Sequence, residues 1–541
     1  MRTYRDRVLL PVLGLALIVG VPSVSAADDE PPAFELIEAD LATIQTAFDA
    51  GGLSAEALTR DYLGRIDALD VAGPRLNTLI SVNAGALDEA RALDLERAGP
   101  GRRGPLHGIP VVIKDSINAA GLPTTGGSAT LRGHEPFHDA TVVARLRGAG
   151  AIVLGKSNLS EMQLPFGRYG YSSAGGQTRN PYNLRRTPYS CATAAAVAAN
   201  LAVLGVGTDS VGELRGSASV AALVGIRPTL GLTSRAGVIP SALSLDVPGP
   251  LARSVRDAAI LLGVMAGVDE ADPRTAESAA YRVGDKAPDY EEGLDEGALD
   301  GARIGILVQY KDGNREVDAA FQQAVRTLKA RRAVTIDIKL PDELTGGWHE
   351  MLDRVLETEL RDQLGAYLRN TEEGMPHSLA DLLRMSESPL IAGSDRPVHP
   401  GRIGGYRNAL RSPGLADLAY LYTLSNRMPA ARGAIIALMD EKELDALAFP
   451  TLLCPAGSLL DDYDSSYECD VDDPDRPTYL ASVTGFPEIT LPMGFSKQGL
   501  PLGLSLLGRP YSEARLIALA YAFEQATGHR RPPESVSTTA D

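Results

Sequence analysis

Five side chains in this sequence could take part in nucleophilic chemistry: Lys114, Ser190, Cys191, Ser210 and Glu213. Lys114 directly follows the apolar run 109–113, a pattern that is typical of a buried strand. A lysine acts as a base only when it is neutral, and burial favours that state. Cys191 precedes an alanine-rich helix, whose N-terminus favours a thiolate, and Ser190 is adjacent to it. A serine or cysteine nucleophile here would need hydrogen-bond reach to Lys114.

Histidine and aspartate clusters raise the question of a metal site. His134 and His138 are four residues apart, but the glycine and proline around them indicate a loop, and we expect a solvent-exposed pair. The segment 461–475 holds seven aspartates, whose oxygens could bind calcium. Its spacing does not match an EF-hand loop, so we favour a solvated acidic loop. The sequence therefore predicts no metal site.

Strand and helix patterns alternate along much of the chain. Residues 140–158 are typical of a helix, a glycine turn and a strand, and residues 193–209 are typical of an alanine-rich helix followed by a strand. Two strands follow near 486–495 and 501–510, before a final helix at 512–527. Such alternation indicates an α/β layer fold.

The composition is that of a globular protein, and the first residues indicate export. Residues 1–26 combine three arginines, an apolar run and a small-residue cleavage pattern at 24–26, which is typical of a signal peptide. The run is too short for a comfortable membrane span, so we expect none after cleavage. The formal net charge is −17, and removing residues 1–26 would leave −19. We exclude nucleic acid as a main partner on this charge, and expect a periplasmic or secreted protein.

The domain organisation predicted after the signal peptide is a single domain over 27–532. Its core would comprise 75–265 and 441–532, separated by a more charged helical insertion at about 270–440. We expect a disordered tail at 533–541. Of the three cysteines, Cys454 and Cys469 could close a small loop, although the sequence does not show whether they are near enough.

Several segments, in order, resemble the amidase-signature family. The resemblance runs from about residue 36 to residue 532, outside parts of the insertion, and is carried by "GPLHGIPVVIKDSI", "TTGGSATL", "DATVVARLRGAGAIVLGKSNLSE", "GGQTRNPYNLRRTP", "VGIRPTLGLTSRAGVIPSALSLDVPGPLARSVRDAA" and "GLPLGLSLLGRPYSEARLIALAYAFEQATGHRRPP". The "GGQTRNPY" segment is most similar to peptide amidases. The resemblance implies a central mixed β-sheet flanked by helices on both faces, hydrolysis of a small-molecule amide or peptide C-terminal amide, and no cofactor.

The family's chemistry uses a serine nucleophile, a second serine in the cis conformation and a lysine. The lysine must be neutral to draw a proton from the nucleophile through the second serine. Backbone N–H groups beside the nucleophile hold the oxyanion. Lys114 matches the family lysine in its motif.

Both serine loops depart from the family pattern. The second serine normally lies in a loop of Gly-Ser-Ser-Gly-Gly-Ser type, but residues 188–194 read PYSCATA, about two residues shorter and without glycine. Counting back from the following helix puts Tyr189 at the cis-serine position, and Ser190 is a possible remnant of that pair. Without glycine this loop loses access to unusual backbone dihedrals.

The nucleophile loop carries the larger departure. Residues 208–215 read TDSVGELR, so Glu213 stands at the serine position, and Ser210, Val211 and Gly212 form the oxyanion loop. A carboxylate there opposes the charge that develops in the transition state. We favour an ion pair between Glu213 and Lys114, which would hold Lys114 charged.

These departures predict a catalytically impaired or inactive member of the family. One alternative is an active amidase with a displaced nucleophile, Ser210, Cys191 or Ser190, and Lys114 as its base. Another is a non-catalytic protein that binds peptides or amides, or that has an interaction role in the cell envelope.

Overall fold

The described part of the chain folds around one large mixed sheet. The computed structural model describes residues 34–163, 169–281, 289–311, 313–459, 462, 464–467 and 469–536. Within them, eleven strands pair in the order β1 (Leu79–Val82), β3 (Ile152–Ser157), β2 (Pro110–Lys114), β6 (Leu204–Asp209), β8 (Val247–Ala252), β7 (Val224–Arg227), β12 (Glu488–Phe495), β13 (Pro501–Leu507), β11 (Ala446–Pro450), β9 (Arg303–Leu307) and β10 (Val334–Ile338). A separate short hairpin joins β4 (Tyr171–Ser172) to β5 (Gly176–Gln177). The expected α/β fold with a central mixed sheet is confirmed.

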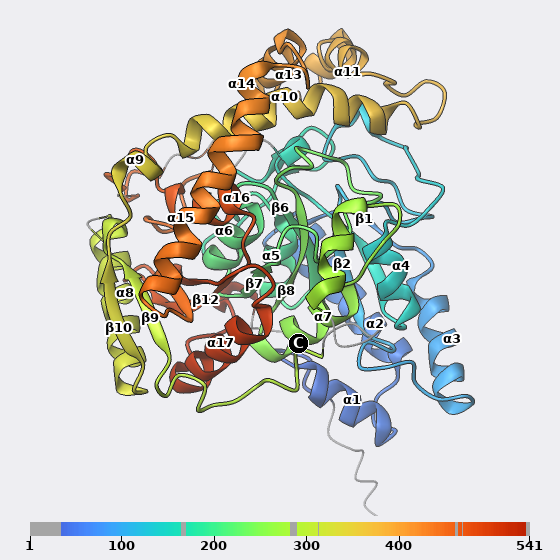
Figure 1. Cartoon of the computed structure of the whole chain (residues 1–541). Coiled ribbons are helices and arrows are strands. Elements are labelled where there is room, and N and C mark those ends of the chain that lie inside the picture. The colour runs from blue at the N-terminus through green and yellow to red at the C-terminus, as the bar shows by residue number, and fades with distance from the viewer. Residues whose placement is uncertain are drawn as a thin grey trace, which may run out of the picture. The chain divides into compact units, whose positions relative to one another are not determined.

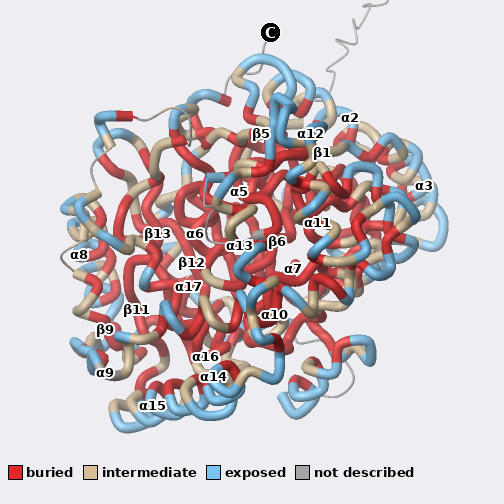
Figure 2. Tube along the Cα trace, turned by 90° about the horizontal axis from the view of Figure 1, so that it is seen from above, coloured by how far each residue is buried: buried red, intermediate tan, exposed pale blue. Residues whose placement is uncertain are grey.

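Helices of the core cover both faces of this sheet (Figure 2). They are α1 (Leu41–Asp49), α2 (Ala55–Arg65), α3 (Ala86–Ala98), α4 (Thr141–Gly148), α5 (Ala192–Ala198), α6 (Glu213–Val220), α7 (Val255–Met265), α16 (Tyr479–Thr484) and α17 (Glu513–Thr527). The helices α5 and α6 pack on one face, and α7 and α17 pack on the other. The wholly buried α5 is built almost entirely of alanine, whose small side chain lets the helix approach the strands closely.

The segment between β8 and β11 supplies most of the remaining helices, several of which gather at the top of Figure 1. They are α8 (Arg315–Ala330), α9 (Asp342–Thr345), α10 (Trp348–Leu368), α11 (Leu379–Ser386), α12 (Pro389–Ala392), α13 (Pro400–Arg411), α14 (Leu418–Tyr422) and α15 (Met428–Glu441). The predicted insertion is not purely helical, because β9 and β10 lie in the same segment and extend the main sheet beside β11. Both strands have only five residues, so their apolar pattern is too short to stand out within a charged, helical segment.

Two of the predictions concern the ends of the chain, the signal peptide and the disordered tail. The signal peptide 1–26 lies outside the described residues. Residues 1–35 separate as a unit of their own, of which only Phe34 and Glu35 are described, and residues 36–541 form the other unit. Residues 534–536 form a 3-10 turn that contacts the core, so the predicted disordered tail does not begin at 533. Across the described residues, no helix is both long and apolar enough to cross a bilayer.

Three parallel strands set the position of the candidate site. The strand β2 pairs in parallel with β3 on one side and with β6 on the other. The carboxyl ends of β2, β3 and β6 therefore meet at one edge of the sheet, where open α/β sheets bind ligands. Lys114 ends β2, Glu161 follows β3, and the loop Ser210–Gly212 follows β6.

Candidate active site

Lys114 is wholly buried at this edge and contacts a residue of the neighbouring strand. Its Nζ donates a hydrogen bond to the Oγ1 of Thr208, at 2.9 Å, and lies 3.5 Å from the carbonyl oxygen of the same residue. Thr208 belongs to β6, which runs parallel to β2, so register alone brings the two side chains together. Thr208 is not among the residues that the sequence singles out, although it opens the segment TDSVGELR that contains Glu213.

Glu213 is the first residue of α6, and its side chain turns back onto the preceding loop. Its Oε2 accepts hydrogen bonds from the backbone N–H of Ser210, at 2.7 Å, and of Val211, at 2.8 Å. The side chain is nearly buried, with 8% of its surface exposed. A carboxylate therefore occupies two of the backbone donors that an oxyanion would need at this position.

The expected ion pair between Glu213 and Lys114 is not formed between these two described residues. The Glu213 carboxylate binds the N–H groups two and three residues before it, and Lys114 donates to Thr208. Hydrogen bonds from backbone N–H groups to a carboxylate satisfy its charge without a cation. The expectation failed because it allowed only side-chain partners for a buried carboxylate.

The tight loop before α6 depends on Gly212. Its φ is +111°, a left-handed conformation that side chains rarely adopt, and a Cβ at this position would lie 2.6 Å from Oγ1 of Thr478. Its N–H donates to Oδ1 of Asp209 at 3.1 Å. The loop is thus fixed in the shape that points the Ser210 and Val211 N–H groups at Glu213.

Asp209 anchors this loop to the core through two arginines. Arg215 donates to both carboxylate oxygens of Asp209, at 2.8 and 3.0 Å, and Arg227 donates to Oδ1 at 2.7 Å. Arg215 also donates to the carboxylate of Glu488 on β12, at 2.6 Å. Burial alone would raise the pKa of Asp209, but the two guanidinium groups outweigh it and hold that pKa well below its usual value.

Ser210 is hydrogen-bonded to a second buried carboxyl group. Its Oγ donates to Oδ1 of Asp246 at 2.6 Å, and Oδ2 of Asp246 accepts from the backbone N–H of Ser241 and Ala242. Burial, together with the nearby charge of Glu213, raises the pKa of Asp246 to about 7 against the effect of these hydrogen bonds. The Ser210 hydroxyl is therefore held by Asp246, and its hydrogen bond does not lead to Lys114.

Tyr189, which counting places at the cis-serine position, has its side chain packed on α6. Its ring lies so close to Gly216 that a Cβ there would be 2.5 Å from the ring, and it forms a small apolar cluster with Val220, Leu452 and Ala456. Its φ is +68°, in the region that glycine occupies without strain. The backbone thus keeps a glycine-like turn in this loop, although the sequence has no glycine there.

The other two nucleophile candidates of this loop are buried beside the sheet edge. The backbone carbonyl of Ser190 accepts from the N–H of Ser160, and the N–H of Cys191 donates to Oγ of Ser217. Cys191 is a free, fully buried cysteine whose sulfur faces Gly207 of β6. Among the described residues, no hydrogen bond joins Lys114 to Ser190, Cys191 or Ser210.

Comparison with known proteins now decides the family. A family model described as Amidase matches residues 57–517. The chain is 32% identical to a probable amidase of Arabidopsis thaliana over 98% of both chains. The native peptide amidase of Stenotrophomonas maltophilia superposes with a TM-score of 0.82 at 39% identity, covering 93% of this chain and 99% of that one. An amidase family protein of Bacillus anthracis superposes with a TM-score of 0.80 at 30% identity, covering 92% of this chain and 93% of that one. The chain belongs to the amidase-signature family.

A cavity lies between loops of the core and the helical insertion. It has a volume of about 870 Å³, and its lining includes Thr125, Thr130, Ser173, Met385, Leu390 and Arg396. The first three residues come from loops of the core, and the others come from the insertion at α11, α12 and the residues after them. Ser173 is therefore in the wall of a cavity that the core and the insertion share.

His134 corrects a second expectation. It is buried, not exposed, and its ring nitrogens contact Oε2 of Glu372, at 2.6 Å, and the hydroxyl of Tyr367, at 3.2 Å. Tyr367 in turn donates to Oδ1 of Asn118 at 2.7 Å. These contacts join a core loop to the end of α10. No group of three or more potential metal-ligating side chains is found among the described residues.

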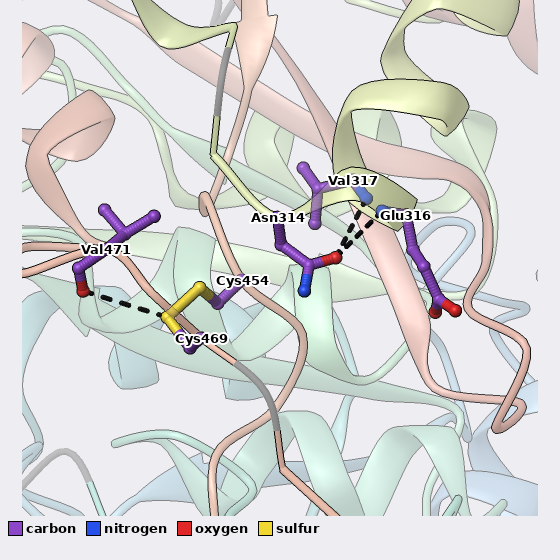
Figure 3. The surroundings of a disulfide bond; sticks show 6 residues. All are labelled: Asn314, Glu316, Val317, Cys454, Cys469 and Val471. Carbon is purple, nitrogen blue, oxygen red and sulfur yellow. Dashed lines mark hydrogen bonds between the residues drawn. A yellow bond between two sulfur atoms is a disulfide. The ribbon is translucent and has the colours of Figure 1, made fainter.

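The disulfide that the sequence left open is formed. Cys454 and Cys469 are bonded, with their Cα atoms 5.8 Å apart, and the carbonyl oxygen of Val471 lies 3.8 Å from Sγ of Cys469 (Figure 3). The same view shows Asn314, whose Oδ1 accepts from the first N–H groups of α8. The acidic segment expected to be solvated contains part of this disulfide loop, and its Asp464 is ion-paired with Arg186 at 3.0 Å.

Proposed function

We propose that this protein binds small-molecule or peptide amides in the amidase cleft without hydrolysing them. One observation carries the proposal: Oε2 of Glu213 accepts the backbone N–H groups of Ser210 and Val211. Those donors would have to stabilise the oxyanion of a tetrahedral intermediate. With a carboxylate on them, they are occupied by a negative charge, and the hydroxyl that should attack is missing.

The chemistry of the three family positions supports the same conclusion. A carboxylate could attack an amide only through an anhydride, with a poor amine leaving group. The cis-serine position is occupied by Tyr189, whose ring is packed on α6. Lys114 is retained and buried, and it donates a hydrogen bond to Thr208. A base without a nucleophile and an oxyanion hole gives little acceleration.

Relatives support amides and peptides as the ligand class. One structure of the similar peptide amidase is a complex with the competitive inhibitor chymostatin, at 39% identity to this chain. That structure superposes on 93% of this chain with a TM-score of 0.81. We extend the ligand class, and not the reaction, to this protein.

A second candidate function rests on the contact between Thr208 and Lys114. A hydroxyl 2.9 Å from a buried lysine has the geometry of a nucleophile and its base. In this alternative, the chain is an active amidase that uses Thr208. Its side chain is 2% exposed, so a substrate could reach it only if the loop 210–213 moved.

Ammonia release from a panel of peptide amides and simple amides tests both candidates. We expect no turnover by the wild type. A variant that combines Glu213→Ser with a Gly/Ser loop rebuilt at 189–191 should gain at least about 10²-fold over the wild type, because it restores the hydroxyl and frees the two donors. Glu213→Gln is the matched control: it removes the charge but keeps a side-chain oxygen on the donors, so it should stay silent.

The outcome that contradicts the proposal is turnover by the wild type. If that turnover is lost in Thr208→Val, the second candidate is correct. If it is lost in Ser210→Ala, Ser190→Ala or Cys191→Ala, the displaced nucleophile is one of those. Adding Lys114→Met to the repaired variant should abolish its gain, since the lysine would then act as the base.

We also propose that the protein is exported. The charged start, apolar run and cleavage pattern of residues 1–26 support this, as does the Cys454–Cys469 disulfide, since disulfides persist in oxidising compartments. N-terminal sequencing of the mature protein tests the proposal: a chain that still carries residues 1–26 would contradict it.

A further inference from the structure

Arg402 is a buried arginine whose nitrogen atoms have no hydrogen-bond partner among the described residues. It lies on α13 with 3% of its surface exposed, and Nε, Nη1 and Nη2 all lack a partner. Its guanidinium carbon sits 4.2 Å above the ring of Tyr406, one turn further along the helix. The hydroxyl of Tyr406 is also buried, and no residue of the described chain accepts from it or donates to it. Buried polar groups in folded proteins are almost always hydrogen-bonded, so these groups are open to a partner from outside the described part of the chain.

Glu161 presents an unpartnered acceptor close to them. It follows β3, is 3% exposed, and its Oε2 accepts the backbone N–H of Ser173 at 3.0 Å. Its Oε1 is buried and has no partner within the described chain. Glu161 and Arg402, both described, do not form an ion pair. Burial raises the pKa of Glu161 and lowers the pKa of Arg402, and the field of each group acts on the other.

These three residues lie beside the catalytic edge. Met162, next to Glu161, belongs to the same buried apolar cluster as Tyr406, and Val211 of the oxyanion loop packs against that cluster. The insertion therefore shares a buried apolar cluster with residues that follow β3 and β6. Ser173, which donates to Glu161, also lines the cavity of about 870 Å³, so the cavity reaches the residue that is bonded to Glu161.

The unused hydrogen-bonding groups define what would fit between them. A ligand must accept from the guanidinium of Arg402 and the hydroxyl of Tyr406, and it must donate to Oε1 of Glu161. A carboxylate would be repelled by Glu161, and an ammonium group would be repelled by Arg402. An amide has a carbonyl acceptor and an N–H donor in one rigid uncharged plane, and it satisfies both sides.

We propose that Arg402, Tyr406 and Glu161 form a subsite that binds an uncharged peptide unit of the ligand. The inference rests on the proposed amide-binding function and names the residues that recognise the chain of a peptide ligand away from Lys114. The carbonyl oxygen of the peptide unit accepts from Arg402 and Tyr406, and its N–H donates to Glu161. These are positioning contacts, and they would orient a ligand without taking part in bond cleavage.

Isothermal titration of the full mature chain with N-acetyl-dialanine amide tests the subsite. We expect Arg402→Met to weaken binding by about 10- to 100-fold, because a hydrogen bond to a charged group is lost. Tyr406→Phe keeps the ring and loses one hydroxyl, and should weaken binding by about 2- to 10-fold. Arg407→Met is the matched control on the same helix: its side chain is 53% exposed and paired with Glu387, so binding should not change.

Thermal melting without ligand gives a readout that a purely structural role would not produce. Arg402→Met removes an uncompensated buried charge, so the ligand-free variant should melt at the same temperature as the wild type or higher. Loss of affinity without loss of stability assigns Arg402 to ligand recognition. A lower melting temperature with unchanged affinity would instead assign it to the fold, with water as its partner, and would overturn the inference.

The outcomes separate this inference from the proposed function. If the wild type does not bind the amide, the proposed function fails, and the subsite fails with it. If the wild type binds and Arg402→Met and Tyr406→Phe bind equally well, only the subsite fails. The free acid N-acetyl-dialanine should bind more weakly than the amide, and tighter binding of the acid would overturn the assignment to an uncharged peptide unit.

Discussion

Arg215 and Arg402 are both buried arginines of one chain, and they differ in how their N–H groups are used. Arg215 is wholly buried on α6, and all three of its side-chain nitrogens donate: to Asp209, to Glu488 and to Ser482 among others. Arg402 is almost as buried on α13, and none of its nitrogens has a partner among the described residues. The first arginine contacts two carboxylates, and the second does not pair with the nearby Glu161.

This difference separates a structural charge from one that is available to a ligand. Arg215 ties the loop before α6 to β12, and its charge is compensated inside the fold. Burying a charge costs several kcal/mol unless partners compensate it. An arginine that is buried without partners therefore lowers stability in the ligand-free state, and this cost is recovered only when something binds it. The contrast is what assigns Arg402 to recognition.

The largest expected change in the free energy of unfolding comes from substituting Arg215. Arg215→Met leaves Glu488 buried without its cation and Asp209 with Arg227 alone, so we expect a loss of about 3–5 kcal/mol in the free energy of unfolding. Urea unfolding monitored by circular dichroism measures it. Arg402→Met, in the same experiment, should cost less than about 1 kcal/mol. Equal losses in the two variants would break the comparison, because Arg402 would then be compensated in the fold.

Two buried aspartates repeat this contrast. Asp209 lies between two guanidinium groups, and its pKa is held well below its usual value in spite of burial. Asp246 is equally buried but is held by hydrogen-bond donors, and burial raises its pKa to about 7. Asp209 therefore stabilises the fold above the unfolded pKa of about 3.9 and stops doing so as the pH falls. Asp246 instead stabilises the fold at low pH and stops doing so as the pH rises.

Asp246→Asn should remove part of the pH dependence of stability. In the wild type, Asp246 binds its proton more tightly when folded, so its contribution is fully present below about pH 4 and is lost as the pH rises to about 7. At 1.36 kcal/mol per pKa unit, the loss amounts to as much as ~4 kcal/mol. Asparagine mimics the neutral acid at every pH.

Urea unfolding of the wild type and Asp246→Asn at pH 5, 6, 7 and 8 measures this contribution. The wild type should lose stability relative to the variant as the pH rises. Asp257 and Glu524 also have a pKa raised to about 7 by burial, and they are present in both proteins, so the difference isolates Asp246. A constant difference across the four pH values would show that Asp246 is already ionised in the folded protein.

The sequence was informative where residues that act together lie in one segment. The motif around Lys114 and the loop 208–215 are each continuous, so the strand ends and the position of Glu213 could be predicted. The partner of Glu213 could not, because the choice between a backbone N–H and a distant lysine depends on the exact turn at Gly212. The strands β9 and β10 were missed because five residues of apolar alternation are a weak signal within a helical segment.

The subsite lies beyond what sequence patterns could show. Glu161 belongs to the core and Arg402 to the insertion, 241 positions later in the chain, and neither residue type is unusual where it stands. Arg402 lies in a polar-looking helix that would be expected on the surface. Its guanidinium is buried because α13 packs against α10 and α11, and it has no hydrogen-bond partner among the described residues.

A smaller effect than those of Arg215→Met and Asp246→Asn is expected around Arg186, an arginine that is intermediate between Arg215 and Arg402. Arg186 is buried, with its Nη2 bonded to Ser466 and ion-paired with Asp464, while Nε and Nη1 have no partner in the described part of the chain. Both of these partners belong to the loop that the Cys454–Cys469 disulfide closes, whereas a third partner of Nη2, Gln498, lies outside it. Cys454→Ser with Cys469→Ser should lower the free energy of unfolding by about 3 kcal/mol, the value expected for a closed loop of 15 residues.

Hydrogen exchange shows where this loss falls. Thr187 lies two residues before Tyr189, and its N–H donates to the carbonyl of Gly457, in the disulfide loop, at 2.9 Å. Exchange should therefore increase in the disulfide loop and at Thr187, and should not change around Arg215. A reducing agent should reproduce the effect in the wild type and have no effect on the double variant. If exchange at Thr187 does not change, the partners of Arg186 hold the loop in place without the disulfide. The guanidinium of Arg186 would then be a structural charge, like that of Arg215.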